Sequence, residues 1–329
     1  MSVVHDGRRE SSYKGTSSKA ILHHYDHLGR FYRLILGQGL VYSYGMWEDG
    51  DTLESAQLRK LDHIAVAAGA VGAARVLDVG CGYGTLVRRL VETHHVQHAV
   101  GITMSPAQVS WAREQDWPGC EVRLENWFDH RPEGPYDAVI AIEAIEHFAG
   151  NTMWRAKRVA RYREFFRRSH SWLRPGGRLC LQANAWNDRG WLPSLALPPR
   201  MLAPHADGGA DAAARRRRLD LREVAGSVRN LREGLHASRT VFPECFLPTR
   251  AELTDAGDGL FRLVESRSDP QDGVRTVASW LSRSEANRTR GAELIGERAV
   301  SDIIREQRAA LKFLKEGRFT SVRMVFEKV

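Results

Sequence analysis

Short apolar runs alternate with longer amphipathic stretches through the middle of the chain. The apolar runs that read as buried strands are 75–80, 98–103, 120–124, 136–142 and 177–183. Amphipathic stretches separate them, such as 151–173, which stops at the turn sequence RPGG. This alternation is typical of an open, mostly parallel, doubly wound sheet in an α/β protein.

Further elements precede and follow this pattern. The segment 20–40 is apolar and aromatic and predicts one or two short helices. A longer helix comes next, with Asp51 as its candidate N-cap, and Glu54 three residues later completes a capping-box pattern. Near the end of the chain, 260–266 and 319–328 read as a last pair of strands.

The connection between the fifth predicted strand and the sequence FPECFLPT is too long for a simple loop. It holds a proline-rich stretch, the arginine run Arg215–Arg218 and an amphipathic helix. The apolar stripe of that helix consists of Leu221, Val224, Val228, Leu231 and Leu235. Ligands of doubly wound sheets bind outside the carboxyl ends of the strands, where such an insertion would cover them. We therefore interpret the insertion, about 187–241, as a lid.

Composition narrows the class of protein. Of the 329 residues, 43% are hydrophobic and 27% are charged, and no apolar run is long enough for a transmembrane helix. The N-terminal sequence MSVVHDGRRE has no apolar core, and the four cysteines lack metal-ligand or CxxC spacing. We expect no metal site and a cytoplasmic location with reduced thiols. The net charge of +8 favours a solvated arginine-rich surface over a surface for nucleic acid or anionic lipid.

The sequence VLDVGCGYGTL (76–86) combines a strand, a glycine-rich turn and the start of a helix. Gly80 and Gly82 let the backbone approach a ligand where a Cβ would collide. The glycine spacing is neither the GxGxxG of a pyrophosphate site nor that of a P-loop. Asp78 and an uncharged turn suit the amino-acid end of S-adenosylmethionine better than a phosphate. A structural turn in an unrelated α/β protein is the alternative.

The next two predicted strands are followed by candidates for the rest of such a cofactor. No acid follows the strand at 98–103, so Thr103 and Gln108 would supply neutral hydrogen bonds to the ribose. After the third strand, Asn126 would bond the amino edge of adenine, and Trp127 would stack on its face. For Trp127, a rim tryptophan in a hydrophobic patch is the alternative.

Nine ordered blocks resemble the cyclopropane fatty acid and mycolic acid synthases, a branch of the class I S-adenosylmethionine methyltransferases. The frame is similar to that of plant alkaloid N-methyltransferases. The resemblance runs from about His23 to the end and is weakest in the lid. The blocks are HHYD, FYRLILG, YSYGMW, TLESAQLRKLD, VLDVGCGYG, GITMSPAQ, IEAIEHF, LRPGG and FPECFLPT.

The resemblance implies a Rossmann-like class I methyltransferase domain over residues 71–329. It also implies a helical N-terminal cap within residues 1–70 that lies over S-adenosylmethionine, which becomes S-adenosylhomocysteine after transfer. Tyr42 and Ser43 of this cap would touch the cofactor. The other cofactor positions that the resemblance assigns are Gly80, Gly82, Thr103, Gln108 and Trp127.

The block IEAIEHF holds the candidate catalytic residues. The resemblance places Glu146 in the active site, facing the transferred methyl group, with Glu143 and His147 beside it. Methyl transfer from a sulfonium moves positive charge onto the substrate, and a fixed carboxylate stabilises that charge. A histidine can accept a proton near neutral pH. Glu143 equally fits a structural acid bonded to backbone amides, and His147 equally fits a satisfied histidine near the core.

Departures from the family alter the expected chemistry. Cyclopropane synthases remove a proton with bicarbonate held by a Cys, a Glu, a His, a backbone position and a Tyr. Of these side chains only the Glu remains, as Glu146; Tyr44, Gln182 and Gly273 align with the Cys, His and Tyr. A bulky tyrosine and a neutral amide are poor anion binders, which argues against bicarbonate. Tyr44, Gln182 and Asn184 become candidate substrate contacts, with drift in a pocket lining as the alternative.

We therefore expect methyl transfer to nitrogen or an activated carbon of a small, partly apolar, natural-product-like substrate. One alternative is a methyltransferase or cyclopropane synthase for an unsaturated acyl chain, docked on a membrane surface or an acyl carrier by Arg215–Arg218 and the lid helix. Another is a non-catalytic binding protein. No acidic-Pro-Pro-aromatic motif follows the fourth strand, so we expect no nucleic-acid substrate. The sequence leaves a homo-oligomer open.

Overall fold

The computed structural model describes residues 17, 20, 23–188, 221–240 and 244–329. Its centre is a seven-stranded sheet of order β3-β2-β1-β4-β5-β7-β6. The strands are β1 (Arg75–Val79), β2 (His98–Thr103), β3 (Cys120–Leu124), β4 (Tyr136–Ile142), β5 (Leu173–Trp186), β6 (Phe261–Ser268) and β7 (Phe319–Lys328). The first five are parallel, and β7 runs antiparallel between β5 and β6. The predicted doubly wound sheet and its last strand pair are confirmed.

Alternating side chains of the strands enter two separate cores. In β4, Val139 and Ala141 face one core, while Ala138 and Ile140 face the other, as the two-residue repeat of a strand dictates. Helices α6 (Arg155–Trp172) and α10 (Arg250–Gly257) cover the first face. The second face is covered by α3 (Leu53–Ala67), α4 (Thr85–Glu92) and α5 (Pro106–Glu114).

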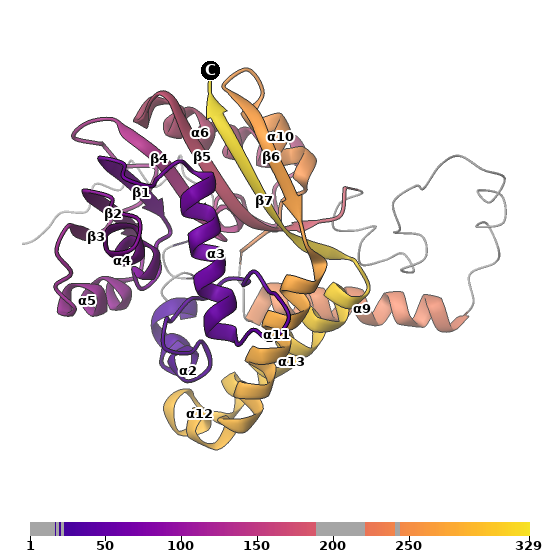
Figure 1. Ribbon diagram of the computed structural model, residues 1–329. Helices are drawn as coiled ribbons and strands as arrows, with labels where there is room; N and C mark the ends of the chain where they lie inside the picture. Colours follow the sequence, from indigo (N-terminus) through magenta and orange to yellow (C-terminus); the bar gives the residue numbers. More distant parts are fainter. Residues whose placement is uncertain (1–16, 18–19, 21–22, 189–220, 241–243) are drawn as a thin grey trace, which may run out of the picture.

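A third core belongs to a helical layer at the carboxyl end of β5, where β5 meets the start of β7. In Figure 1 these helices lie together below the sheet. They come from both ends of the chain, so the N-terminal segment packs against the C-terminal helices. They are α2 (Gly29–Ile35), α9 (Leu221–Thr240), α11 (Pro270–Ala286), α12 (Arg288–Ile295) and α13 (Glu297–Lys315). Two short helices complete the elements near the site: η1 (His23–His27) precedes α2, and η2 (Ile145–His147) follows β4.

The predicted N-cap of α3 is wrong by one residue. Thr52 caps the helix: its hydroxyl accepts a hydrogen bond from the Ser55 amide, and the Ser55 hydroxyl accepts one from the Thr52 amide. The carboxylate of Asp51 is instead held by Arg59, two turns along the helix, at 2.8 Å. This ion pair removes Asp51 from the capping position, and the shorter Thr52 side chain takes it.

The predicted lid helix is present as α9. It packs on α13 through polar pairs, in which Arg305 bonds Glu233 and Lys312 bonds Asn230. Of the predicted apolar stripe, Leu231 packs into the third core, whereas Val228 is 53% exposed. The side chains at 221 and 224, the proline-rich stretch and the four arginines lie outside the described residues.

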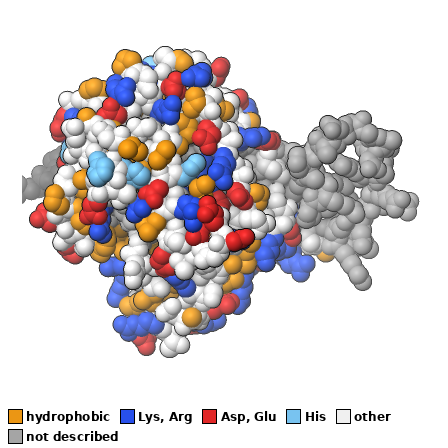
Figure 2. Space-filling model, viewed as in Figure 1, with side chains coloured by type: hydrophobic (Ala, Val, Ile, Leu, Met, Phe, Trp, Pro, Cys, Tyr) orange, Lys and Arg blue, Asp and Glu red, His pale blue; other side chains and the backbone are white. Residues whose placement is uncertain are grey.

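The surface shows mixed charge. In Figure 2, basic and acidic side chains are intermingled over the described residues of the visible face. The net charge of +8 is thus not gathered into one basic patch on this face, and the solvated surface stays a prediction. Among the helices in the described part of the chain, none is long and apolar enough to cross a membrane.

Candidate active site

Two neighbouring pockets lie where the sheet meets the helical layer. The smaller, about 140 Å³, surrounds the glycine-rich turn after β1 and is called the glycine-loop pocket here. The larger, about 430 Å³, lies between the segment that follows β4 and helix α13, and is called the apolar cavity. Tyr25, Tyr42, Glu143 and His147 line both. These four residues therefore mark the junction between the pockets.

The turn itself has room for a ligand only on one side. Gly80 has a φ of +79°, and a Cβ there would lie 2.6 Å from the Cβ of Ala144. Gly82 has a φ of +55°, and a Cβ there would meet nothing within 4 Å. The backbone at Gly80 is thus packed against the chain after β4, while the backbone at Gly82 is open to the pocket. Both positions require glycine because of their left-handed conformation.

A buried carboxylate and a buried ammonium share this pocket. The Lys60 Nζ donates to the Ser43 hydroxyl at 2.7 Å, and Asp78 Oδ1 has no hydrogen-bond partner among the described residues. Burial raises the pKa of Asp78 to about 7, against the opposing charge of Lys60. Burial also lowers the pKa of Lys60 to about 7. A buried acid and a buried amine in one pocket suit a ligand that carries both an amine and a carboxylate.

Thr103 and Gln108 lie together in the lining of the same pocket. The Thr103 hydroxyl donates to Gln108 Oε1 at 2.7 Å, and both side chains are buried. Ser105, between them, caps α5 and donates its hydroxyl to Asp26 of η1. The N-terminal segment is thereby attached at the edge of the glycine-loop pocket.

Of the two residues after β3 that were expected to contact adenine, only Trp127 lines the pocket. Trp127 lines the glycine-loop pocket and packs against Phe148, with ring centroids 4.8 Å apart. Asn126 is absent from the lining, because its side-chain oxygen accepts a bond from the Phe128 amide at 2.9 Å and closes a turn. Glu125 lines the pocket instead. Sequence reasoning missed both Glu125 and Lys60.

The carboxylate of Glu143 is fully engaged in hydrogen bonds within the protein. It has a φ of +51°, unusual for a residue with a Cβ. Its carboxylate accepts bonds from the Tyr44 amide at 2.8 Å, Gln182 Nε2 at 2.8 Å and Asn184 Nδ2 at 3.0 Å. Burial raises its pKa, and these donors oppose that shift. The geometry agrees with the reading of Glu143 as a structural acid that fixes the loop.

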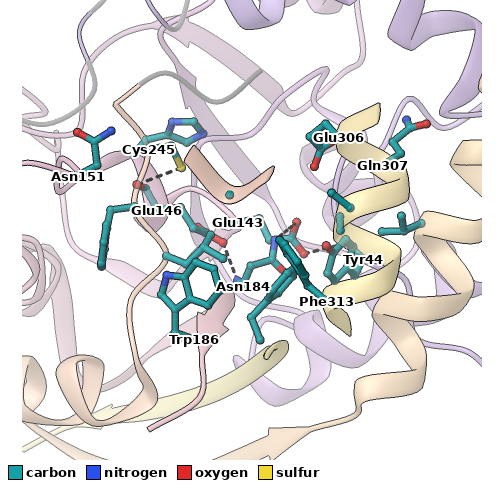
Figure 3. Close-up of a pocket in the computed structure, with 18 of the residues that line it drawn as sticks. Tyr44, Glu143, Glu146, Asn151, Asn184, Trp186, Cys245, Glu306, Gln307 and Phe313 are labelled. Carbon is teal, nitrogen blue, oxygen red and sulfur yellow. Dashed lines mark hydrogen bonds between the residues drawn. The ribbon is translucent and has the colours of Figure 1, made fainter. Parts of the chain in front are cut away.

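Glu146 keeps one oxygen free. Its Oε1 accepts a bond from the Asn184 amide at 2.6 Å, while Oε2 is buried and has no partner among the described residues. The residue is 3% exposed and lines the apolar cavity. Burial, with a contribution from the nearby negative charge of Glu143, raises its pKa to about 8. Glu146 is therefore a lining residue of the apolar cavity with one buried, unpartnered carboxylate oxygen (Figure 3).

His147 lies at the junction. Its Nε2 is 3.1 Å from the Tyr25 hydroxyl, and its Nδ1 has no hydrogen-bond partner in the described part of the chain. Burial lowers its pKa to about 4, so the imidazole is neutral at pH 7. A neutral imidazole with an open nitrogen can accept a proton from a ligand.

Only two of the three predicted substrate contacts line a pocket. Tyr44 and Asn184 line the apolar cavity, but Gln182 lines neither pocket. The amide of Gln182 is fully buried, where it donates to Glu143 and to the Tyr44 carbonyl at 2.9 Å and accepts from Arg323 at 2.8 Å. Its position suits a residue that orients Glu143 from behind.

Tyr44 and Gly273 are packed against each other. A Cβ at Gly273 would lie 3.1 Å from the Tyr44 ring and 2.8 Å from Leu314. The ring of Tyr44 thus occupies the space that a side chain at 273 would need. The absence of a side chain at 273 and the bulky residue at 44 are complementary.

Comparisons with known proteins agree with this geometry. The family model described as mycolic acid cyclopropane synthetase matches residues 13–305. The cyclopropane mycolic acid synthase MmaA2 of Mycobacterium tuberculosis is 34% identical over 164 residues, which are 48% of this chain and 53% of the relative. The match therefore spans about half the length of this curated relative.

Two solved structures have the same fold. The structure of MmaA2 from Mycobacterium tuberculosis superposes with a TM-score of 0.75 at 23% identity, over 95% of this chain and 99% of that one. Coclaurine N-methyltransferase bound to N-methylheliamine and SAH gives 0.65 at 20% identity, over 98% and 90%. These likenesses confirm the expected Rossmann-like fold class. By the match of the family model to most of its length, the chain belongs to the mycolic acid cyclopropane synthetase family.

Proposed function

We propose that this protein is an S-adenosylmethionine-dependent methyltransferase that acts on nitrogen or an activated carbon of a small, partly apolar substrate. One observation carries the proposal. Glu146 presents a buried, unpartnered carboxylate oxygen to a cavity that meets the glycine-loop pocket. A protein that only binds ligands would have no use for such a costly group at this position.

The residues of the glycine-loop pocket fit the cofactor. S-Adenosylmethionine supplies an electrophilic methyl group on a positively charged sulfur. Asp78 and Lys60 have the charges to hold its amine and carboxylate. Thr103 and Gln108 suit its ribose, and Trp127 suits its adenine ring. Asn126 is engaged in a turn, so the adenine amino group is left to Glu125.

The cavity residues then have separate roles. Glu146 stabilises the positive charge that develops on the methyl-accepting atom. His147, neutral at pH 7, accepts a proton when the accepting atom must lose one. Glu143 positions the loop that carries both, through its bonds to Tyr44, Gln182 and Asn184. Tyr44 and Asn184 form part of the substrate wall.

Ring closure with bicarbonate has little support from this cavity. The Tyr44 ring fills the space beside Gly273, and the Gln182 amide is fully engaged behind Glu143. An anion placed there would face Glu143 and Glu146. The alternative, an unsaturated acyl chain as substrate, is supported by the mainly apolar cavity walls and by the names of the relatives.

The test uses S-adenosylmethionine with a fully deuterated methyl group, incubated with the protein and a small-molecule extract. Mass spectrometry then finds labelled products. A product with all three deuteriums supports simple methyl transfer, whereas a product with two would mean that a methylene was left and that ring closure persists. The Glu146→Gln protein is the control. Absence of labelled product from the native protein, with SAH binding intact, would contradict the proposed function.

A further inference from the structure

The ionisable residues that line the apolar cavity are mainly acidic. Its described lining contains the carboxylates Glu143, Glu146 and Glu306, and no lysine or arginine. Its one basic residue, His147, is neutral at pH 7 because burial lowers its pKa to about 4. Glu143 is satisfied by its three donors. Two acids without a protein cation as partner, Glu146 and Glu306, therefore belong to the described lining of the cavity.

Glu306 is remote from the catalytic loop. It projects from α13, and Figure 3 shows it on the side of the cavity opposite Glu146. It makes no hydrogen bond or ion pair with another described residue. Its charged neighbours on α13 are occupied elsewhere, since Arg305 pairs with Glu233 and Arg308 with Glu285. Burial raises the pKa of Glu306 to about 8. At pH 7 Glu306 is therefore mainly the neutral acid, and a bound cation would favour its ionised form.

Three aromatic rings line the same cavity as Glu306. Tyr42 and Tyr44 both pack on Trp280, with ring centroids at 5.2 Å and 5.9 Å, and all three line the cavity. Burial raises the pKa of both tyrosines, and the negative charge of Glu306 adds to the shift. The faces of tyrosine and tryptophan attract cations, most strongly where water is excluded. A cavity lined by an unpartnered acid and three such rings has the composition of an ammonium site.

We infer that Glu306, Tyr42, Tyr44 and Trp280 bind a cationic group of the substrate, a protonated amine or a quaternary ammonium. This inference rests on the proposed function and narrows its substrate class to a basic compound. The atom that accepts the methyl group must be uncharged to attack, and it lies beside Glu146 and His147. The charge at Glu306 therefore belongs to a second group of the same substrate. A hydrocarbon chain in this place would leave Glu306 uncompensated.

Binding measurements with a charged and an uncharged probe of the same shape test the inference. Phenyltrimethylammonium and tert-butylbenzene differ in one atom, nitrogen or carbon, and the ammonium charge does not titrate. Calorimetry on the full chain with SAH bound would give the affinity of each. We expect the native protein to prefer the cation, and Glu306→Gln to weaken the cation about tenfold while changing the neutral probe less than twofold. Glu297→Gln, an exposed acid on the same helix, should change neither.

Other results would overturn the inference. Equal affinity of the native protein for both probes would mean that the cavity does not recognise charge. An equal loss of both probes in Glu306→Gln would mean that the residue shapes the cavity only. These outcomes are separate from the deuterium test. Labelled neutral products together with no preference for the cation would refute the cationic subsite and leave methyl transfer standing, and the reverse combination would refute methyl transfer alone.

Discussion

Replacement of Glu146 by glutamine should stabilise the protein and reduce its activity at the same time. Glutamine has the shape of glutamate and keeps the bond from the Asn184 amide to the side-chain oxygen. It removes the ionisable group, and with it the charge that the buried, unpartnered carboxyl would carry above about pH 8. The substitution therefore separates the electrostatic role of Glu146 from its packing.

The magnitude follows from the pKa of Glu146, which burial raises from 4.5 to about 8. The folded state holds this proton up to about pH 8, whereas the unfolded chain releases it near pH 4.5, so folding takes up a proton between these values. Stability of the native protein then falls as pH rises, by about 1.4 kcal/mol per pH unit, to a total penalty of about 4–5 kcal/mol above pH 8. The glutamine variant escapes this penalty. Methyl transfer should fall by about 10²–10³.

Urea unfolding at pH 5 and pH 8.5 measures the free energy of unfolding, and deuterium incorporation measures transfer. We expect the two proteins to be similar at pH 5 and the variant to be more stable at pH 8.5. Glu252 offers a contrast, because it is equally buried but bonds Arg158 at 2.6 Å. Glu252→Gln should destabilise the protein at both pH values. A Glu146→Gln variant with no gain in stability at pH 8.5 would refute the view that this carboxylate is unpaired.

Three further predictions concern the frame of the site. Gly273→Tyr should destabilise the protein by about 1–3 kcal/mol through collision with Tyr44, and the double variant with Tyr44→Cys should recover much of that loss in thermal unfolding. Arg323→Met should cost about 3–5 kcal/mol in urea unfolding, since it leaves the buried carboxylate of Asp272 without its 2.7 Å partner. Lys60→Met should weaken SAH binding about tenfold by calorimetry. Because the folded protein releases the Lys60 proton at about pH 7 and the unfolded chain only near pH 10.5, the free energy of unfolding of the native protein rises between these pH values. The methionine variant should lack this rise. Unchanged SAH affinity would exclude Lys60 from the cofactor site.

Most of the fold could be predicted from the periodicity of apolar residues, because the patterns of strands and helices are local in the sequence. The five parallel strands and the last antiparallel pair lie where the apolar runs predict them, with shifts of a few residues at their ends. The amphipathic stripe of α9 was less informative. Its polar residues Asn230 and Glu233 make the contacts with α13, whereas Val228 is exposed. The domain division after residue 70 and the cytoplasmic location stay predictions.

The site was less predictable where a residue's role depends on a partner distant in the chain. Nothing local to Gln182 indicates that its amide joins Tyr44, Glu143 and Arg323. Glu306 reads as an ordinary acid of an amphipathic helix until that helix is placed against the cavity. Lys60 did carry a signal: it follows Leu53 by seven residues and therefore shares the buried face of α3.

Tyr44 and Gly273 are complementary in the structure, so the departures from the family that the sequence resemblance implies at these two positions are interpreted here as one rearrangement. Independent drift in a pocket lining would leave a cavity at one position or a collision at the other. Here the Tyr44 ring fills the space beside Gly273. The backbone amide of Tyr44 donates to the Glu143 carboxylate, and the backbone carbonyl of Tyr44 accepts a bond from the Gln182 side-chain amide. Both carboxylates of the catalytic loop are retained around this new wall. A site rebuilt in this coordinated way, with Glu146 still open to the cavity, fits a change of substrate better than a loss of catalysis.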